Sequence, residues 1–230
     1  MKRTPPAQMS ETVRLGAVLA AAGGFLDAYT YLTRGGVFAN AQTGNIVLLG
    51  VYLAQGQFRT AGRYLIPILA FAAGVIVAEL IKSDVYKRQA LHWRQITVGA
   101  ELAILAAVAF LPQRWNVPAN LAVSFVCAMQ VESFRKIRGN TYATTMCTGN
   151  LRSATELLFR CCRSGGRCER EQCLQYYGII LFFACGAALG ALFCRSLGER
   201  AVLLACLLLA AAFLLMFRNG ETRGRGRGKA

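Results

Sequence analysis

Long apolar stretches separated by short charged segments dominate this chain. Six stretches of 15 to 21 residues contain no charged side chain or only isolated ones: 13–33, 64–81, 96–111, 117–131, 175–194 and 201–217. A helix needs about 20 mostly apolar residues to cross the hydrocarbon core of a bilayer. The pattern therefore predicts an all-α polytopic membrane protein with six transmembrane helices.

The first stretch also has features of a secretory signal peptide, because basic residues precede it and alanines occupy 20–22. However, the apolar run continues to Tyr31 and takes part in an internal repeat. We therefore expect it to remain in the protein as the first span.

The net charge of +15 would favour nucleic-acid binding in a soluble protein. Here the basic residues cluster between the apolar runs, as they do beside membrane spans, and they alternate with glycine in RGRGRGK at 223–229. We expect their partners to be membrane lipids and not nucleic acid. Residues 1–12 are predicted to form a cytoplasmic tail, and 218–230 a basic C-terminal tail.

The tripeptide Thr-Gly-Asn occurs twice, at 43–45 and 105 positions later at 148–150. An acidic residue precedes each copy by 16 positions, namely Asp27 and Glu132. Chance matches between Ala- and Leu-rich runs would not reproduce this ordered series of polar residues. The chain is therefore predicted to contain an internal duplication.

The duplication extends to a pattern of small residues that lets helices approach closely in lipid. If seven residues are inserted after the second tripeptide, the pattern small-x3-small aligns between the two halves: Gly74 with Ala78, and Gly186 with Gly190. We predict a first membrane repeat at 13–117 and a second at 118–217.

Each Thr-Gly-Asn opens a helical run that is too short to span. The first, 43–55, has 13 residues, or about 20 Å at ~1.5 Å per residue, against a core of ~30 Å. If neither run crosses, both termini are cytoplasmic and only 6 of the 26 Lys and Arg residues lie outside: Arg34, Arg59, Arg63, Arg114, Arg195 and Arg200. An eight-span alternative divides the basic residues less unevenly, so six spans fit the positive-inside rule better.

Three spans per repeat place the second repeat in the opposite orientation to the first. The predicted architecture is therefore a 3+3 inverted repeat with two short re-entrant half-helices. Such repeats are widespread among secondary transporters, in which broken helices meet near the bilayer midplane.

The N-terminus of a buried half-helix has unpaired N–H groups and a partial positive charge. Threonine is a preferred N-cap residue, glycine allows a ligand to approach closely, and asparagine supplies a side-chain donor and acceptor. We predict that a small polar or anionic solute binds at both turns. The predicted substrate-binding residues are Thr43, Gly44, Asn45, Thr148, Gly149, Asn150, Asn40 and Gln42.

Asp27 and Glu132 are predicted to bind a proton or cation that is cotransported with the solute, because ionisable groups at depth are costly and usually functional. In the alternative, each carboxylate caps the half-helix next to it and nothing is transported there. Glu79 and Glu101 are isolated acids near span ends, a position more typical of the membrane interface.

The chain contains no G-x-S-x-G, H-E-x-x-H or P-loop sequence, so we expect it not to be an enzyme and to need no cofactor. Four of the nine cysteines form CC-x5-C-x4-C at 161–173. This spacing lacks the C-x2-C pairs of structural zinc sites, and we therefore expect no metal there.

The segment 23–50 resembles the YoaK-like family of bacterial inner-membrane proteins, a domain of unknown function. The matching positions are Asp27, Phe38, Thr43, Gly44 and Asn45 in the first motif, and Thr148 with Gly149 in the second. The resemblance covers roughly 13–217 and implies a six-span protein of the bacterial plasma membrane, without implying a substrate. Second halves in the family more often have a neutral residue where this chain has Glu132.

From these observations we expect a secondary transporter for a small polar or anionic solute, coupled to a proton or cation. A passive channel or exporter is the first alternative, and a membrane scaffold or regulator that conducts nothing is the second. A carrier would have a cavity at the two Thr-Gly-Asn turns, whereas a scaffold would pack them tightly. A homo-oligomer is compatible with any of the three.

Overall fold

The six predicted apolar stretches are helical in the computed structural model, which describes residues 13–85, 93–134, 136–137, 140–141, 145, 147–164 and 167–218. The corresponding helices are α1 (Val13–Thr33), α3 (Phe58–Val85), α4 (Trp93–Val108), α5 (Asn116–Ser133), α7 (Arg167–Leu197) and α8 (Val202–Arg218). The predicted tails, 1–12 and 219–230, lie outside the described residues.

Two further helices, α2 (Gln42–Ala54) and α6 (Cys147–Ser164), contain the Thr-Gly-Asn copies. Short 3-10 turns lie at Gln113–Trp115 (η2) and Gly198–Ala201 (η3). The described strands are limited to an antiparallel pair, β1 (Lys136–Ile137) and β2 (Asn140–Thr141). The predicted helical fold class is therefore confirmed.

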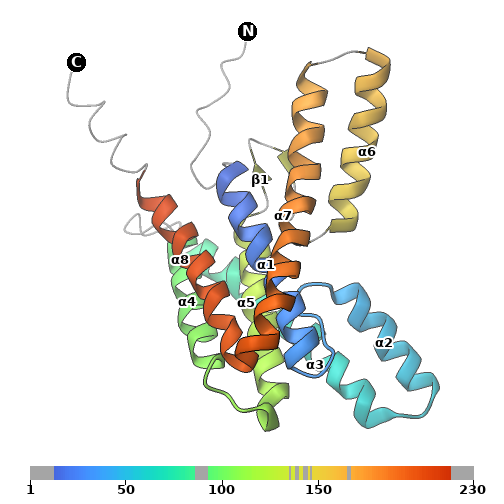
Figure 1. The fold of residues 1–230 in the computed structure, drawn as a ribbon, viewed down its shortest axis with the longest axis vertical. Coiled ribbons are helices and arrows are strands. Elements are labelled where there is room, and N and C mark those ends of the chain that lie inside the picture. Colours follow the sequence, from blue (N-terminus) through green and yellow to red (C-terminus); the bar gives the residue numbers. More distant parts are fainter. Residues whose placement is uncertain are drawn as a thin grey trace.

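Three stretches are long and apolar enough to cross a membrane: Val13–Thr33, Phe58–Ser83 and Glu169–Met216. The third contains both α7 and α8, which Figure 1 shows running antiparallel on either side of η3. The apolar part of α4, Gln95–Val108, is shorter, and α5 buries several polar residues among its apolar ones. Length and composition therefore identify fewer spans than the six predicted.

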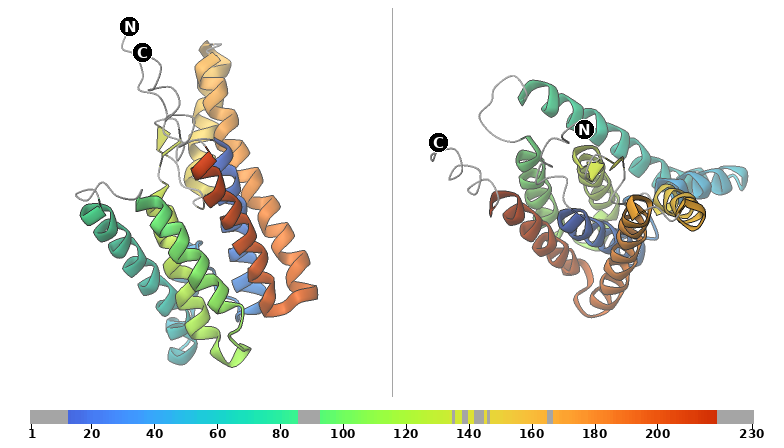
Figure 2. Two further views of the ribbon diagram at one scale, coloured as in Figure 1. Left: turned by 90° about the vertical axis from the view of Figure 1, so that its left-hand side faces the viewer. Right: turned by 90° about the horizontal axis from the view of Figure 1, so that it is seen from above.

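Helices from the two halves of the chain interleave in the bundle. α1 packs against α7, and α5 packs against α3. α2 lies on α3 as α6 lies on α7, and α4 contacts α5 as α8 contacts α1. Figure 2 shows α1 and α5 near the centre, with the other long helices around them. The α2–α3 and α6–α7 hairpins extend toward opposite ends of the molecule (Figure 1).

The repeated small residues lie where the long helices cross most closely. A Cβ atom added to Gly186 would overlap the carbonyl group of Ala21 on α1, and Gly190 faces the same helix one turn later. In the other half, a Cβ atom on Gly74 would overlap the carbonyl group of Phe125 on α5. The predicted role of these residues in close helix packing is therefore confirmed.

Two details of the predicted half-helices are wrong. α2 has the expected 13 residues but begins at Gln42 with Ala41 as its N-cap, so Thr43 does not cap it. α6 begins at Cys147, before Thr148, and its 18 residues make it longer than a half-helix. The part of α6 after the tripeptide, 151–163, is mostly exposed and carries Arg152, Glu156, Arg160 and Arg163.

Arg34 was assigned by its sequence position to an outer loop, but its side chain is buried and only 1% exposed. Its guanidinium donates hydrogen bonds to the carbonyl oxygens of Val108 (3.0 Å) and Leu111 (2.8 Å) at the end of α4. It also donates to the Tyr29 hydroxyl at 2.8 Å. A helix end needs partners for its last carbonyls, and a cation suits its negative end. Arg34 therefore fixes the end of α1 to the end of α4.

Candidate functional site

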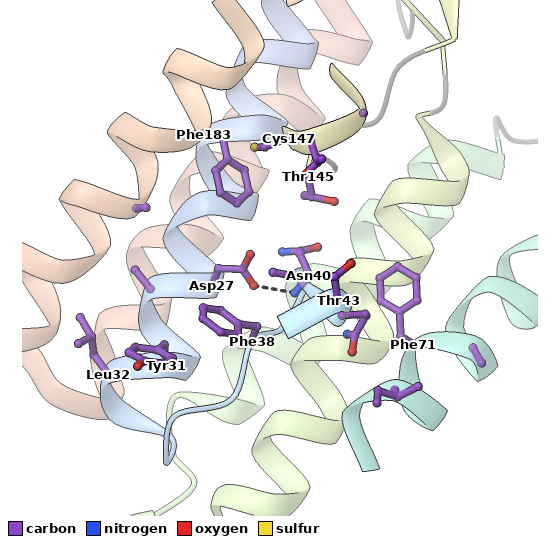
Figure 3. A pocket seen from close by; sticks show the side chains of 18 residues that line it. Asp27, Tyr31, Leu32, Phe38, Asn40, Thr43, Phe71, Thr145, Cys147 and Phe183 are labelled. Carbon is purple, nitrogen blue, oxygen red and sulfur yellow. Dashed lines mark hydrogen bonds between the residues drawn. The ribbon is translucent and has the colours of Figure 1, made fainter. Parts of the chain in front are cut away.

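A cavity of about 800 Å³ lies between the first turns of α2 and α6. α1, α3 and α7 complete its walls, and Figure 3 shows the side chains that point into it. Six of the ten predicted site residues line this cavity: Asp27, Asn40, Gln42, Thr43, Thr148 and Gly149. The other four do not: Gly44, Asn45, Asn150 and Glu132.

Asp27 is buried on α1 and holds the chain that enters α2. Its Oδ1 atom accepts a hydrogen bond from the backbone N–H of Asn40 at 2.6 Å, and the N–H groups of Ala39 and Ala41 also interact with the carboxylate. The Asn40 side chain in turn donates to the carbonyl oxygen of Gly23 at 3.2 Å. Figure 3 shows the second carboxylate oxygen directed into the cavity. Asp27 thus holds the loop directly before α2, with one oxygen facing the cavity, but α2 has no side-chain cap bond, so the helix capping left open as an alternative is formed only in part.

Asn45 was predicted to contact substrate, but its polar atoms serve the protein itself. Its Oδ1 accepts from the backbone N–H of Phe38 at 3.1 Å, and its Nδ2 donates to the Phe38 carbonyl oxygen at 2.7 Å. Gly44 packs under the same residue, since an added Cβ atom would meet the Phe38 ring at 3.0 Å. The close approach that glycine permits here is to Phe38 and not to a ligand.

The turn at the start of α6 places its threonine and asparagine as the first turn does, but its glycine differs. Thr148 and Gly149 are exposed to the cavity, whereas Asn150 is buried, as Asn45 is in the first copy. An added Cβ atom at Gly149 would meet nothing within 4 Å. The first turn of α6 is therefore open toward the cavity.

Glu132 is buried but lies outside the cavity wall. Its Oε1 atom is 3.9 Å from the Nζ of Lys82 on α3. α5 ends at Ser133, directly after Glu132, whereas α1 continues for six residues beyond Asp27 to Thr33. The symmetric pair of cavity acids predicted from the repeat is therefore not formed.

Aromatic side chains make up much of the remaining wall, and the sequence analysis did not identify them as a group. They are Tyr31, Phe38, Phe71 and Phe183. The rings of Tyr31 and Phe38 stack at 4.8 Å with an interplanar angle of 18°. Phe38 lies five residues before the first Thr-Gly-Asn, in the first motif of the family resemblance, but the others lie within apolar helices where no spacing distinguishes them.

The electrostatics of the cavity differ between its two ends. None of the described lining residues is a lysine or an arginine. At the α2 end, the Asp27 carboxylate already occupies backbone N–H groups of residues 39–41, directly before the helix. At the α6 end, Cys147, Thr148 and Gly149 line the cavity, and the start of a helix favours negative charge. A polar or anionic group is therefore best accommodated at the α6 end, with an apolar body against the aromatic wall.

Residues 15–215 match the family described as a protein of unknown function, DUF1275. The chain is also 30% identical over 148 residues to the UPF0700 transmembrane protein YoaK of Bacillus subtilis strain 168. That alignment covers 61% of this chain and 64% of the relative, just under two thirds of its length. No solved structure matches the chain.

Proposed function

Because this chain belongs to the DUF1275 family and is an integral membrane protein, we propose that it is a secondary transporter of a small solute. The solute carries one polar or anionic group, which binds the first turn of α6, and an apolar part that rests on the aromatic wall. The observation that carries the proposal is the shared cavity between the N-terminal turns of α2 and α6. Ligand sites of carriers are commonly built from such helix ends.

Asp27 is the candidate coupling group in this proposal. It is the only Asp or Glu among the described lining residues, and one of its oxygens faces the cavity. A carboxylate that both holds the loop before α2 and faces the solute transmits a change in its protonation to the loop around Asn40. Coupling to a proton or cation would therefore act through the position of the α2 turn.

The proposed membrane arrangement is a 3+3 inverted repeat in the bacterial plasma membrane, with both termini cytoplasmic. The contact pattern supports it, because exchanging α1–α4 with α5–α8 converts each of the helix pairs described above into another of them. The opposite directions of the α2–α3 and α6–α7 hairpins support it as well (Figure 1). In this arrangement α2 and the start of α6 enter from opposite leaflets.

A solute-stabilisation screen of the purified protein tests the proposal. We expect at least one small polar or anionic solute to raise the melting temperature of the wild type in a saturable manner. Ala72 lines the cavity from α3, and its neighbour Ala73 does not. Ala72→Phe should abolish the stabilisation, while the matched variant Ala73→Phe should retain it.

Transport in vesicles separates the carrier from the alternatives. A carrier exchanges labelled solute against unlabelled solute on the other side, with saturable kinetics. A passive channel conducts without saturation, and a scaffold shows no flux at all. Equal responses of the Ala72→Phe and Ala73→Phe proteins to every solute would contradict a role for this cavity.

A further inference from the structure

A second carboxylate, Glu101 on α4, is buried more completely than Asp27. Its side chain is 1% exposed, and neither Oε1 nor Oε2 has a hydrogen-bond partner among the residues that the structure describes. The sequence alone associated this residue with a span end. Its position inside the bundle is unexpected, because unpaired ionisable groups are rarely left in an apolar interior.

The helices packed against α4 bring no described cation to Glu101. On α3, Lys82 pairs with Glu79 at 2.7 Å and lies 3.9 Å from Glu132. The described side chains of α8 include one titratable group, the thiol of Cys206. A negative charge on Glu101 would therefore be uncompensated, and the neutral acid is much lower in free energy.

α5 connects Glu101 to the cavity. Cys127 on α5 is buried and interacts electrostatically with both Glu101 and Asp27, and its thiol interacts with the Asn40 side chain. The Ser124 hydroxyl on the same helix is also buried, and it has no partner within the described part of the chain. Cys127 thus lies on the helix that packs against α4, and its thiol reaches Asn40 at the cavity wall.

The two carboxylates have contrasting surroundings. Asp27 accepts backbone N–H hydrogen bonds, which stabilise its ionised form, whereas Glu101 accepts none from the described residues. Such pairs of acids in unlike environments divide the charged and neutral roles between them. In this conformation Glu101 is the better holder of a proton.

We propose that Glu101 is a proton-binding site, loaded in this conformation and linked to the cavity through Cys127 and Asn40. Proton binding at Glu101 does not depend on the transport of any solute. Its use in coupling rests on the proposed function, with the proton of Glu101 exchanging with the cavity when the bundle rearranges.

Infrared spectroscopy of the full-length protein in lipid tests proton binding directly. The wild type should show the carbonyl stretch of a protonated carboxyl group at neutral pH, and Glu101→Gln should lose that band. Glu79→Gln is the matched control, because Glu79 is exposed and paired, and it should leave the band unchanged. If Glu101→Gln does not fold, the wild type is prepared with isotope-labelled glutamate. The label should then shift the band, because the band arises from a glutamate.

The absence of a protonated glutamate band in the wild type at neutral pH would overturn the proposal. A band that disappears on adding a monovalent cation would also overturn it, because the site would then hold that cation. The link to the cavity is tested by Cys127→Val, which should shift the carboxyl band of Glu101. An unshifted band would remove Cys127 from the path.

The coupling role is tested separately from the cavity. With a solute identified by the stabilisation screen, Glu101→Gln should still be stabilised by it, but solute addition to vesicles should no longer move protons. A screen in which no solute stabilises the wild type would count against the proposed function and leave the infrared result standing. Unchanged proton movement in Glu101→Gln would refute coupling through Glu101.

Discussion

The two Thr-Gly-Asn turns share a sequence and a cavity but differ in what packs against their glycines. The first turn is tied down by Asp27 through the backbone of Asn40, and by Asn45 through the backbone of Phe38. The second presents Gly149 to open space. The repeat therefore marks two helix starts at one cavity, while the surrounding residues close over Gly44 and leave the space at Gly149 open.

The difference separates a structural role from a binding role within one motif. In both turns the threonine lies at the cavity and the asparagine is buried in the protein. What distinguishes the first turn is the acid on α1 and the ring of Phe38 over Gly44. A solute that enters the cavity therefore meets the Phe38 ring over the first glycine and open space at the second.

The cavity between the two turns would be lost if α1 and α7 separated, because these helices form part of its wall. Gly186→Val places side-chain atoms against the backbone of Ala21, which cannot move aside as a side chain can. We expect a loss of more than about 4 kcal/mol, which prevents recovery of folded protein. Size-exclusion profiles and melting curves in detergent measure it.

Gly178→Val on the same helix is the control, because an added Cβ atom there meets nothing within 4 Å. It should cost less than about 1 kcal/mol. If both variants were equally stable, the close crossing of α1 and α7 would not hold the cavity together.

The next largest effect is expected when the first turn loses its acid. Asp27→Ala removes the acceptor for the Asn40 N–H and leaves buried donors unpaired, at a cost of about 3 kcal/mol. Asp27→Asn keeps an acceptor oxygen and should cost only about 1 kcal/mol. Thermal unfolding of both proteins gives the two values, and equal losses would show that the carboxylate does not brace the turn.

A smaller effect is expected inside the first tripeptide. Asn45→Ala removes both side-chain bonds to the Phe38 backbone and should cost about 2 kcal/mol. Thr43→Ala, two residues earlier, should cost well under about 1 kcal/mol, because that side chain faces the cavity. Thr43→Ala should keep the melting temperature of the wild type in the absence of solute and lose the increase that solute produces. That result would support a binding role for Thr43 and a bracing role for Asn45.

Much of this arrangement follows from the sequence. The apolar stretches place the six helices α1, α3, α4, α5, α7 and α8. The duplicated Thr-Gly-Asn and small-x3-small patterns identify the turns and the close crossings. These features are predictable because each depends on local composition or on a spacing along one helix. Six of the ten predicted site residues lie at one cavity for the same reason, since the repeat marks both helix starts.

The remainder depends on contacts between distant segments, which spacing does not reveal. Arg34 is buried because the end of α4, more than 70 residues away, supplies carbonyl oxygens. Glu132 misses the cavity because α5 ends directly after it. Asn45 braces a loop because Phe38 folds back over it. Glu101 is buried because α4 contacts both α5 and α8.

The same substitution in both tripeptides has the smallest expected effect, and it tests most directly how the two turns differ. Gly149→Ala adds a methyl group in open space within the first turns of a helix, which should stabilise the protein by about 0.5 kcal/mol. Gly44→Ala forces the Phe38 ring to shift from a contact at 3.0 Å, and should destabilise by about 1 kcal/mol. Melting curves of the two variants should therefore move in opposite directions.

The stabilisation by solute should be weakened in Gly149→Ala and retained in Gly44→Ala. The methyl group on Gly149 enters the proposed binding position, and that on Gly44 does not. Shifts of the same sign in both variants would mean that the two turns are held alike.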